Sequence, residues 1–307
     1  MFWALLSGIG ACADAGYYIV NKKFLRSVDP DLLAASGFLF TSLFLLSTSF
    51  CRGIPPLGPD FAMAVTATVA INIIGTTLAF RALKSTDISL AVPMLSFTPL
   101  FLIVTAAVML HEIPSVIGIG GILILVSGSY VLNTAAEHES LLDPFRSMLS
   151  HPGIFSMLVV SFLYAISLGF DKMIVLNSDT IFGSGMVFLL LGSAFSAIHC
   201  LKRWRGRLPE HGVENNSSQL GGIRIFSGSR GLLIAGIIIG VLLTLEAMVI
   251  NAAYLVQIVP YVSAIKRTSI LITVLYGTMV IREEEVFRRV AGAVLMLCGV
   301  VLILFFP

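Results

Sequence analysis

The sequence predicts an all-α integral membrane protein with ten transmembrane helices arranged as two inverted five-helix repeats. Of the 307 residues, 57% are hydrophobic and 12% are charged, and the mean hydropathy is +0.98. Soluble domains of this length do not have such a composition. Apolar runs of about 20 residues, the length that a helix needs to cross the hydrocarbon core, recur along the chain. A motif in the first half of the chain also recurs near its end.

Ten apolar runs are predicted to span the bilayer. The spans are 3–21, 31–50, 61–83, 86–108, 113–132, 153–176, 180–200, 231–255, 259–281 and 287–306. The first run has no basic segment before it and is interrupted by Asp14, so we expect a membrane span and not a signal peptide. Between the spans, 134–152 has apolar residues at helical spacing, which predicts a short interfacial helix. Segment 202–230 is a charged polar loop, with weak glycosylation signals at Asn215 and Asn216.

The second half of the chain repeats the first. "TPLFLIVTAAVMLHE" (98–112) aligns with "SILITVLYGTMVIRE" (269–283) at an offset of 171 residues. The same offset places Gly121 on Gly292 and Gly128 on Gly299. "VNKKFL" (20–25) matches "FDKMIV" (170–175) at an offset of 150, and loop 202–230 accounts for the difference.

Each copy contains five spans. Because five is odd, the second copy enters the membrane from the side opposite to the first, as in many secondary transporters. The predicted domains are therefore a first repeat at 1–132, a connecting segment at 133–152 and a second repeat at 153–307.

The repeated segments also resemble a known family. "FRALKSTDISLAVPMLSFTPLFLIVTAAVMLHE" (80–112), followed by "GIGGILILVSGSYVL" (118–132), resembles the EamA-type domain of the drug/metabolite transporter superfamily. The likeness lies in an Ala-Leu-Lys turn after an aromatic residue, a Ser/Pro-containing span, a closing Glu and a Gly-spaced fifth helix. "NAAYLVQIVPYVSAIKRTSILITVLYGTMVIREE" (251–284) and "AGAVLMLCGVVLIL" (291–304) repeat the pattern less closely. The resemblance implies a ten-helix permease that works by alternating access, without naming a substrate.

Several function classes find no support in the sequence. No nucleophile elbow, P-loop or zinc-protease motif is present, so we expect neither an enzyme nor a catalytic residue. The five histidines lack metal-ligand spacing, and the four cysteines lie far apart in or beside apolar runs, as free thiols do. No basic patch with interleaved aromatic residues is found, which excludes nucleic acid as a partner. We expect no cofactor and no bound metal.

Four charged residues lie far from the ends of their predicted spans: Asp14, Glu246, Lys266 and Arg267. Each costs about 2.5–3.5 kcal/mol at the centre of a bilayer, so such residues usually mark functional sites. From their positions along spans 8 and 9, Glu246 and Lys266 lie at similar depths, roughly 14 and 10 Å from one membrane face. Three alternatives stay open for Lys266 and Arg267: snorkelling to the interface, a structural ion pair with Glu246 or Asp14, and an anion-binding site.

We favour the anion site for Lys266 and Arg267. The pair resembles the Lys-Arg pair with which plastid sugar-phosphate translocators of the same superfamily hold the substrate phosphate. Leu95 and Ser96 occupy the matching positions of the first repeat, so the charge belongs to the second repeat alone. Further polar residues at helical spacing are predicted to line the same cavity: Asn72, Thr76, Tyr164, Ser263 and Thr273. Asp14 and Glu246 are predicted to bind protons or to balance charge, and Pro93 and Pro99 to kink the fourth span.

The sequence therefore predicts a multi-pass cell-membrane protein (inner membrane in a bacterium), a secondary active transporter that moves a small organic metabolite with an anionic group. The expected partners are the metabolite, the lipid bilayer, and protons or a counter-substrate; the protein is a monomer or a homodimer. One alternative is a proton-coupled exporter of amino acids or drugs in which Lys266 and Arg267 are structural. Another is a lipid-binding membrane partner that transports nothing.

The orientation in the membrane has two conflicting predictions. Of the 19 Lys and Arg residues, two lie within the ninth span, and only Arg52 and Lys172 fall at the end of the spans that carries both termini. The positive-inside rule thus places the opposite end in the cytoplasm and both termini outside. The family resemblance implies cytoplasmic termini, and we follow it at this stage.

Overall fold

The computed structural model describes residues 1–133, 152–206, 229–281 and 286–306, and its described residues form helices without a strand. The helices are α1 (Phe2–Phe24), α2 (Pro30–Arg52), α3 (Phe61–Ser85), α4 (Ile88–Ala91), the 3₁₀ helix η1 (Val92–Phe97), α5 (Thr98–Leu110), α6 (Val116–Asn133), α8 (Pro152–Leu176), α9 (Phe182–Trp204), α10 (Ser229–Tyr254), α11 (Val259–Lys266), α12 (Ser269–Ile281) and α13 (Val286–Phe305). The interfacial helix expected in 134–152, most of loop 202–230, and Asn215 and Asn216 lie outside the described residues.

Six described helices are long and apolar enough to cross a membrane: α2, α3, the continuous stretch Val92–Leu110, α8, α9 and Arg230–Tyr254 within α10. Val116–Leu132 and Val290–Phe305 are apolar but shorter. The predicted first span coincides with α1, where Asp14 and two tyrosines lower the hydropathy. The predicted ninth span is divided between α11 and α12. The all-helical membrane class is thus confirmed, whereas the count of ten spans is not.

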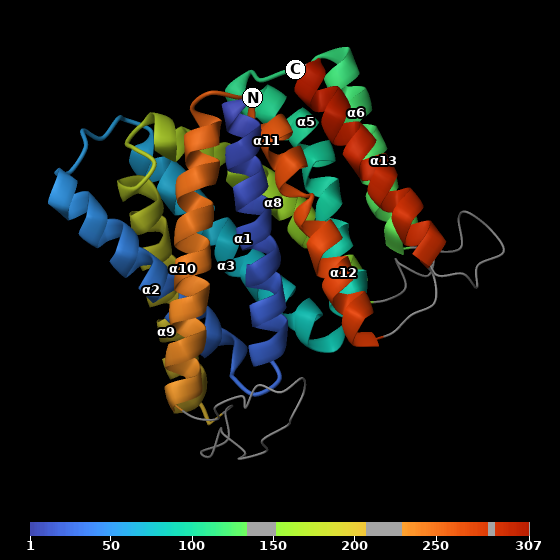
Figure 1. The fold of residues 1–307 in the computed structure, drawn as a ribbon. Coiled ribbons are helices and arrows are strands. Elements are labelled where there is room, and N and C mark those ends of the chain that lie inside the picture. The colour runs from blue at the N-terminus through green and yellow to red at the C-terminus, as the bar shows by residue number, and fades with distance from the viewer. Residues whose placement is uncertain (134–151, 207–228, 282–285, 307) are drawn as a thin grey trace.

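The long helices pack side by side (Figure 1). Neighbouring helices are mostly antiparallel, whereas α2 and α10 run in the same direction, with Gly37 against Ile239 and Gly240 against Thr41. Helix α2 packs against α9 and α10, α1 against α10, α3 against α8, and α6 against α13. The N-terminus and the C-terminus lie at the same end of the bundle (Figure 1). We call this the terminal end and the other the basic end, because the helices there finish in Lys22 and Lys23 of α1, Lys84 of α3, and Lys202 and Arg203 of α9.

Two glycine pairs hold α6 against α13. A Cβ atom at Gly121 would lie 2.9 Å from the carbonyl oxygen of Gly299, and one at Gly128 would lie 2.8 Å from that of Gly292. Glycine at these positions therefore lets the two backbones approach more closely than a side chain allows, as in other membrane helix pairs.

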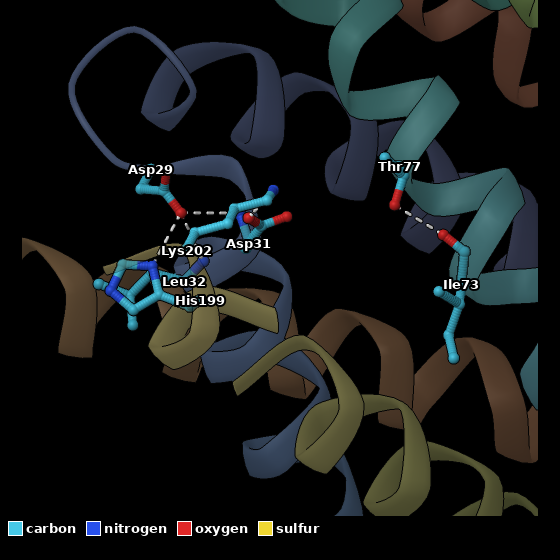
Figure 2. Close-up of polar contacts among 7 residues, drawn as sticks. All are labelled: Asp29, Asp31, Leu32, Ile73, Thr77, His199 and Lys202. Carbon is cyan, nitrogen blue, oxygen red and sulfur yellow. Dashed lines mark hydrogen bonds and ion pairs between the residues drawn. The ribbon is translucent and has the colours of Figure 1, made fainter. Parts of the chain in front are cut away.

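Polar residues fix the helix ends at the basic end (Figure 2). Asp29 Oδ1 accepts the backbone N–H groups of Asp31 and Leu32 at 3.1 and 3.2 Å, which caps α2. The same oxygen lies 3.1 Å from Nδ1 of His199, and Lys202 forms an ion pair with Asp31. These contacts join the start of α2 to the end of α9. Elsewhere, hydroxyls bond within their own helix, as Thr77 does to the carbonyl of Ile73 at 2.7 Å (Figure 2).

Candidate functional site

A cavity of about 170 Å³ lies among α1, α2, α3, α8, α9 and α10, and the junction between α11 and α12 closes one of its walls. It extends from Asp14 and Thr76, near the middle of their helices, toward Asn251 and Tyr254 at the terminal end of α10. Its wall combines apolar side chains with three carboxylates and two cations. A polar cavity inside a membrane-spanning bundle is where transporters bind substrates.

One wall holds a network of four charges. Lys266 forms an ion pair with Glu246, and its Nζ also lies 3.5 Å from Oδ1 of Asp14. Nη1 of Arg267 lies 3.8 Å from Oδ2 of Asp14. Three of these residues are buried, with Lys266 at 8% exposure, Arg267 at 2% and Asp14 at 3%, and Glu246 is half-buried. Since charge is costly in an apolar interior, the mutual pairing is what allows the four groups to stay there.

A break in the predicted ninth span places the two cations. Helix α11 ends at Lys266 and α12 begins at Ser269. Between them, the N–H of Thr268 bonds to Ile265 and the N–H of Ile270 bonds to Arg267, which are three-residue spacings of a tight turn. Lys266 and Arg267 thus stand at the C-terminal end of α11, where the helix dipole favours positive charge. Such interrupted helices line binding sites in many membrane transporters.

Hydroxyl groups fix the network on either side of this break. Ser269 Oγ donates to Oδ2 of Asp14 at 2.7 Å, and Nη2 of Arg267 donates to Oγ1 of Thr98 at 3.1 Å. Nε of Arg267 is buried and has no hydrogen-bond partner among the described residues. Arg267 thus lines the cavity while its Nε–H group stays buried without an acceptor in the described part of the chain.

A second polar cluster anchors the start of α11 at the terminal end. Glu112 accepts the backbone N–H of Val259 at 2.8 Å and forms an ion pair with Lys172. Lys172 Nζ also donates to the carbonyl of Gln257 at 3.0 Å. Glu112 thus caps the short helix whose other end carries Lys266, and it does not reach the cavity.

Another part of the cavity wall is formed by α3 and α8. Oγ1 of Thr68 donates to Oδ1 of Asp171 at 3.0 Å, and Nδ2 of Asn72 donates to Oγ of Ser167 at 2.6 Å. Thr68 is buried, whereas Asp171 and Asn72 are half-buried on the cavity wall. This wall therefore presents one carboxylate held by a hydroxyl, together with an amide.

Aromatic rings line much of the remaining surface. Tyr17 and Tyr18 of α1 pack edge to face, with ring centroids 5.3 Å apart. Tyr164 lies against Gly75, where a Cβ atom would come within 2.9 Å of its ring. The hydroxyl of Tyr254 is buried without a hydrogen-bond partner among the described residues. Both charged walls thus adjoin rings that can stack on an organic solute.

The cavity brings together most of the predicted site residues: Asp14, Asn72, Thr76, Tyr164, Glu246, Lys266 and Arg267. Ser263 and Thr273 are buried but do not belong to the cavity wall. Thr273 donates to its own helix, at the carbonyl of Ile270. The predicted roles of all these residues in binding and coupling remain predictions.

The predicted site did not include Asp171, Ser167 and Asn251, which also line the cavity. Asp171 lies on the α8 face that contains Tyr164, one turn beyond Leu168, and this spacing was the available signal. Asn251 donates to Oγ of Ser184 at 2.6 Å. Among the described residues, no group of His, Cys, Asp and Glu has the arrangement of a metal site.

Comparisons with known proteins agree with this architecture. Residues 1–134 match the family model of the EamA-like transporter family, which confirms the resemblance seen in the sequence. No curated protein matches the chain. A solved structure, titled only as the crystal structure of a protein, superposes with a TM-score of 0.69 at 14% sequence identity, and covers 97% of this chain and 95% of its own. At that identity the likeness concerns the fold alone.

Proposed function

We propose, from the EamA-like match of residues 1–134 and the charged central cavity, that this multi-pass membrane protein is a secondary active transporter. It moves a small organic metabolite by exposing the cavity alternately to the two sides of the membrane. An anionic group of the metabolite contacts Lys266 and Arg267. The fold we propose is ten spans in two inverted repeats.

The bounds of the interrupted helices support the inverted repeats. Helices α4 and α11 begin at Ile88 and Val259, and α5 and α12 begin at Thr98 and Ser269. Helices α5 and α12 then end at Leu110 and Ile281. All three pairs are separated by the 171 residues that align the two copies in the sequence. Both predicted spans therefore break at equivalent positions, although only the first contains prolines at the break.

The helix contacts have the same symmetry. Gly121 meets Gly299 and Gly128 meets Gly292, whereas the sequence aligns Gly121 with Gly292. Such crossed contacts are those of two copies related by a two-fold axis. Likewise, Lys22 donates to the carbonyl of Thr86 at 2.5 Å, and its counterpart Lys172 donates to that of Gln257, the counterpart of Thr86.

The observation that carries the proposal is the placement of Lys266 and Arg267. They stand at the break of an interrupted helix, face the cavity, and touch acids that an anionic solute can replace. An anion that enters has to displace Glu246 from Lys266, so loading the site and releasing Glu246 are coupled events.

The test is a thermal-shift screen of purified protein against small organic acids, organic phosphates and zwitterions, followed by counterflow of the hits in proteoliposomes. Lys266→Gln is expected to abolish counterflow, whereas the exposed Lys84→Gln at the basic end leaves it unchanged. Glu246→Gln is expected to strengthen anion binding by about tenfold, since the competing carboxylate is gone. Full counterflow by a folded Lys266→Gln variant would remove the proposal.

The ion pairs of Lys266 and Arg267 with acidic residues favour a second function. Because both cations already contact acids, the four groups also suit a proton-coupled exporter of amino acids or drugs in which Lys266 and Arg267 are structural. In that case Glu246→Gln abolishes the response of export to a pH gradient, and anion affinity does not rise. Measuring both quantities in the same variant separates the two functions.

A further inference from the structure

We propose that Asp171, with the hydroxyl of Thr68, forms an ammonium-binding subsite in the cavity that Lys266 and Arg267 also line. The transported metabolite then carries an ammonium group as well as its anionic group. This inference rests on the proposed function and names the substrate class more narrowly, as a zwitterion with an apolar or aromatic body.

The first argument for this subsite comes from the charged residues that line the cavity. Three carboxylates and two cations face the cavity. Within the described residues, each ion pair at the cavity involves Lys266 or Arg267, and their partners are Asp14 and Glu246. Asp171 takes part in none of these pairs. It therefore faces the cavity without an ion-pair partner among the described residues, and a charge inside a membrane protein is stabilised by such a partner.

The second argument comes from the hydrogen bonds of Asp171. Its Oδ1 accepts from Thr68 at 3.0 Å, and each carboxylate oxygen offers about two acceptor sites, so most of its capacity is left for a ligand. A solute with only an anionic group would occupy the Lys266 wall and leave Asp171 uncompensated. A solute that also carries an ammonium group satisfies both walls.

The composition of the cavity favours an organic ammonium over a metal ion. The space of about 170 Å³ exceeds that of one coordinated ion. The aromatic rings of Tyr17, Tyr164 and Tyr254 also line the wall. Ring faces attract ammonium groups and stack on apolar bodies. Asn72 adds an amide group beside the same subsite.

The experiment compares three probes with one aromatic framework: phenylalanine, phenethylamine and 3-phenylpropanoate. Binding to purified full-length protein is measured calorimetrically at low sodium. We expect wild-type protein to bind phenylalanine most tightly. Asp171→Asn should lower the affinity for phenylalanine and phenethylamine by about tenfold or more. The affinity for 3-phenylpropanoate should stay the same or rise. Asp171→Glu, which keeps the charge, should retain amine binding.

The exposed Asp60→Asn is the matched control, and thermal unfolding of each variant reports folding. Equal binding of amines by wild type and a folded Asp171→Asn overturns the inference, and so does a wild type that binds neither amine. Sodium alone stabilising the wild type but not Asp171→Asn also overturns it, in favour of a metal-ion site. If binding depends on Asp171 but no counterflow is seen, the subsite is supported and the proposed transport is rejected. If counterflow is the same in wild type and Asp171→Asn, transport is supported and the subsite is rejected.

Discussion

At the scale of single residues, Asp14 connects the groups of the charged wall. Its carboxylate contacts Lys266, Arg267 and the hydroxyl of Ser269. The hydroxyl comes from the first residue of α12, while the carboxylate stands midway along α1. Asp14 therefore ties the interrupted helix to α1, and the bond from Ser269 is the shortest of its hydrogen bonds and ion pairs.

Ser269→Ala tests this link. The substitution removes a donor from a buried carboxylate, which costs about 1–3 kcal/mol when the acceptor stays buried. We expect a lower midpoint of thermal unfolding in detergent and weaker binding of the solutes found by the screen. Ser47→Ala is the control, because the exposed Ser47 donates only within its own helix, to Phe44. Equal midpoints for the two variants would show that Ser269 does not support the network.

The charged residues of this wall were predictable because ionisable groups are rare within apolar runs. Asp14, Glu246 and Lys266 each interrupt such a run, and the structure brings them together. Asp171 was not assigned to the site, because it lies five residues before the end of α8 and precedes Lys172. A charge in such a position is usually ascribed to the membrane interface, and sequence alone does not show that its side chain turns inward.

At the scale of helices, a break inside a span changes which residues share a face. Ser263 and Thr273 were assigned to one face of a continuous helix. The tight turn between α11 and α12 separates them, so that neither lines the cavity. Pro93 and Pro99 predicted a kink in the fourth span, and each is the second residue of a helix there, η1 and α5. No proline marks the equivalent break after Lys266, which the hydropathy pattern therefore does not reveal.

The glycine contacts between α6 and α13 give the prediction at this scale. A side chain at Gly121 meets the carbonyl of Gly299 and Ile303, whereas one at Gly120 meets nothing within 4 Å. We expect Gly121→Val to destabilise the protein by about 1–3 kcal/mol through overpacking. Gly120→Val alters the same helix at the adjacent position and should behave as wild type. Thermal unfolding in detergent measures both, and similar losses would assign the effect to helix propensity instead of packing.

At the scale of the whole molecule, the charge asymmetry between the two ends decides the orientation we expect. The described ends of α1, α3 and α9 carry basic residues at the basic end. Of the two cations at the terminal end, Lys172 is paired with Glu112. This pairing leaves Arg52 as the cation there that can respond to the positive-inside rule. We therefore expect the basic end in the cytoplasm and both termini outside, against the expectation taken from the family.

Native cysteines can report this orientation. Asp31 at the start of α2 pairs with Lys202 at the end of α9, so Cys51 near the end of α2 and Cys200 near the end of α9 lie at opposite ends of the bundle. All four cysteines are exposed. In single-cysteine variants, a membrane-impermeant maleimide should label Cys51 in intact cells and Cys200 only after permeabilisation. Cys298, midway along α13, should stay unlabelled both in intact and in permeabilised cells, because lipid surrounds it. Labelling of Cys200 in intact cells would place the termini in the cytoplasm and overrule the charge argument.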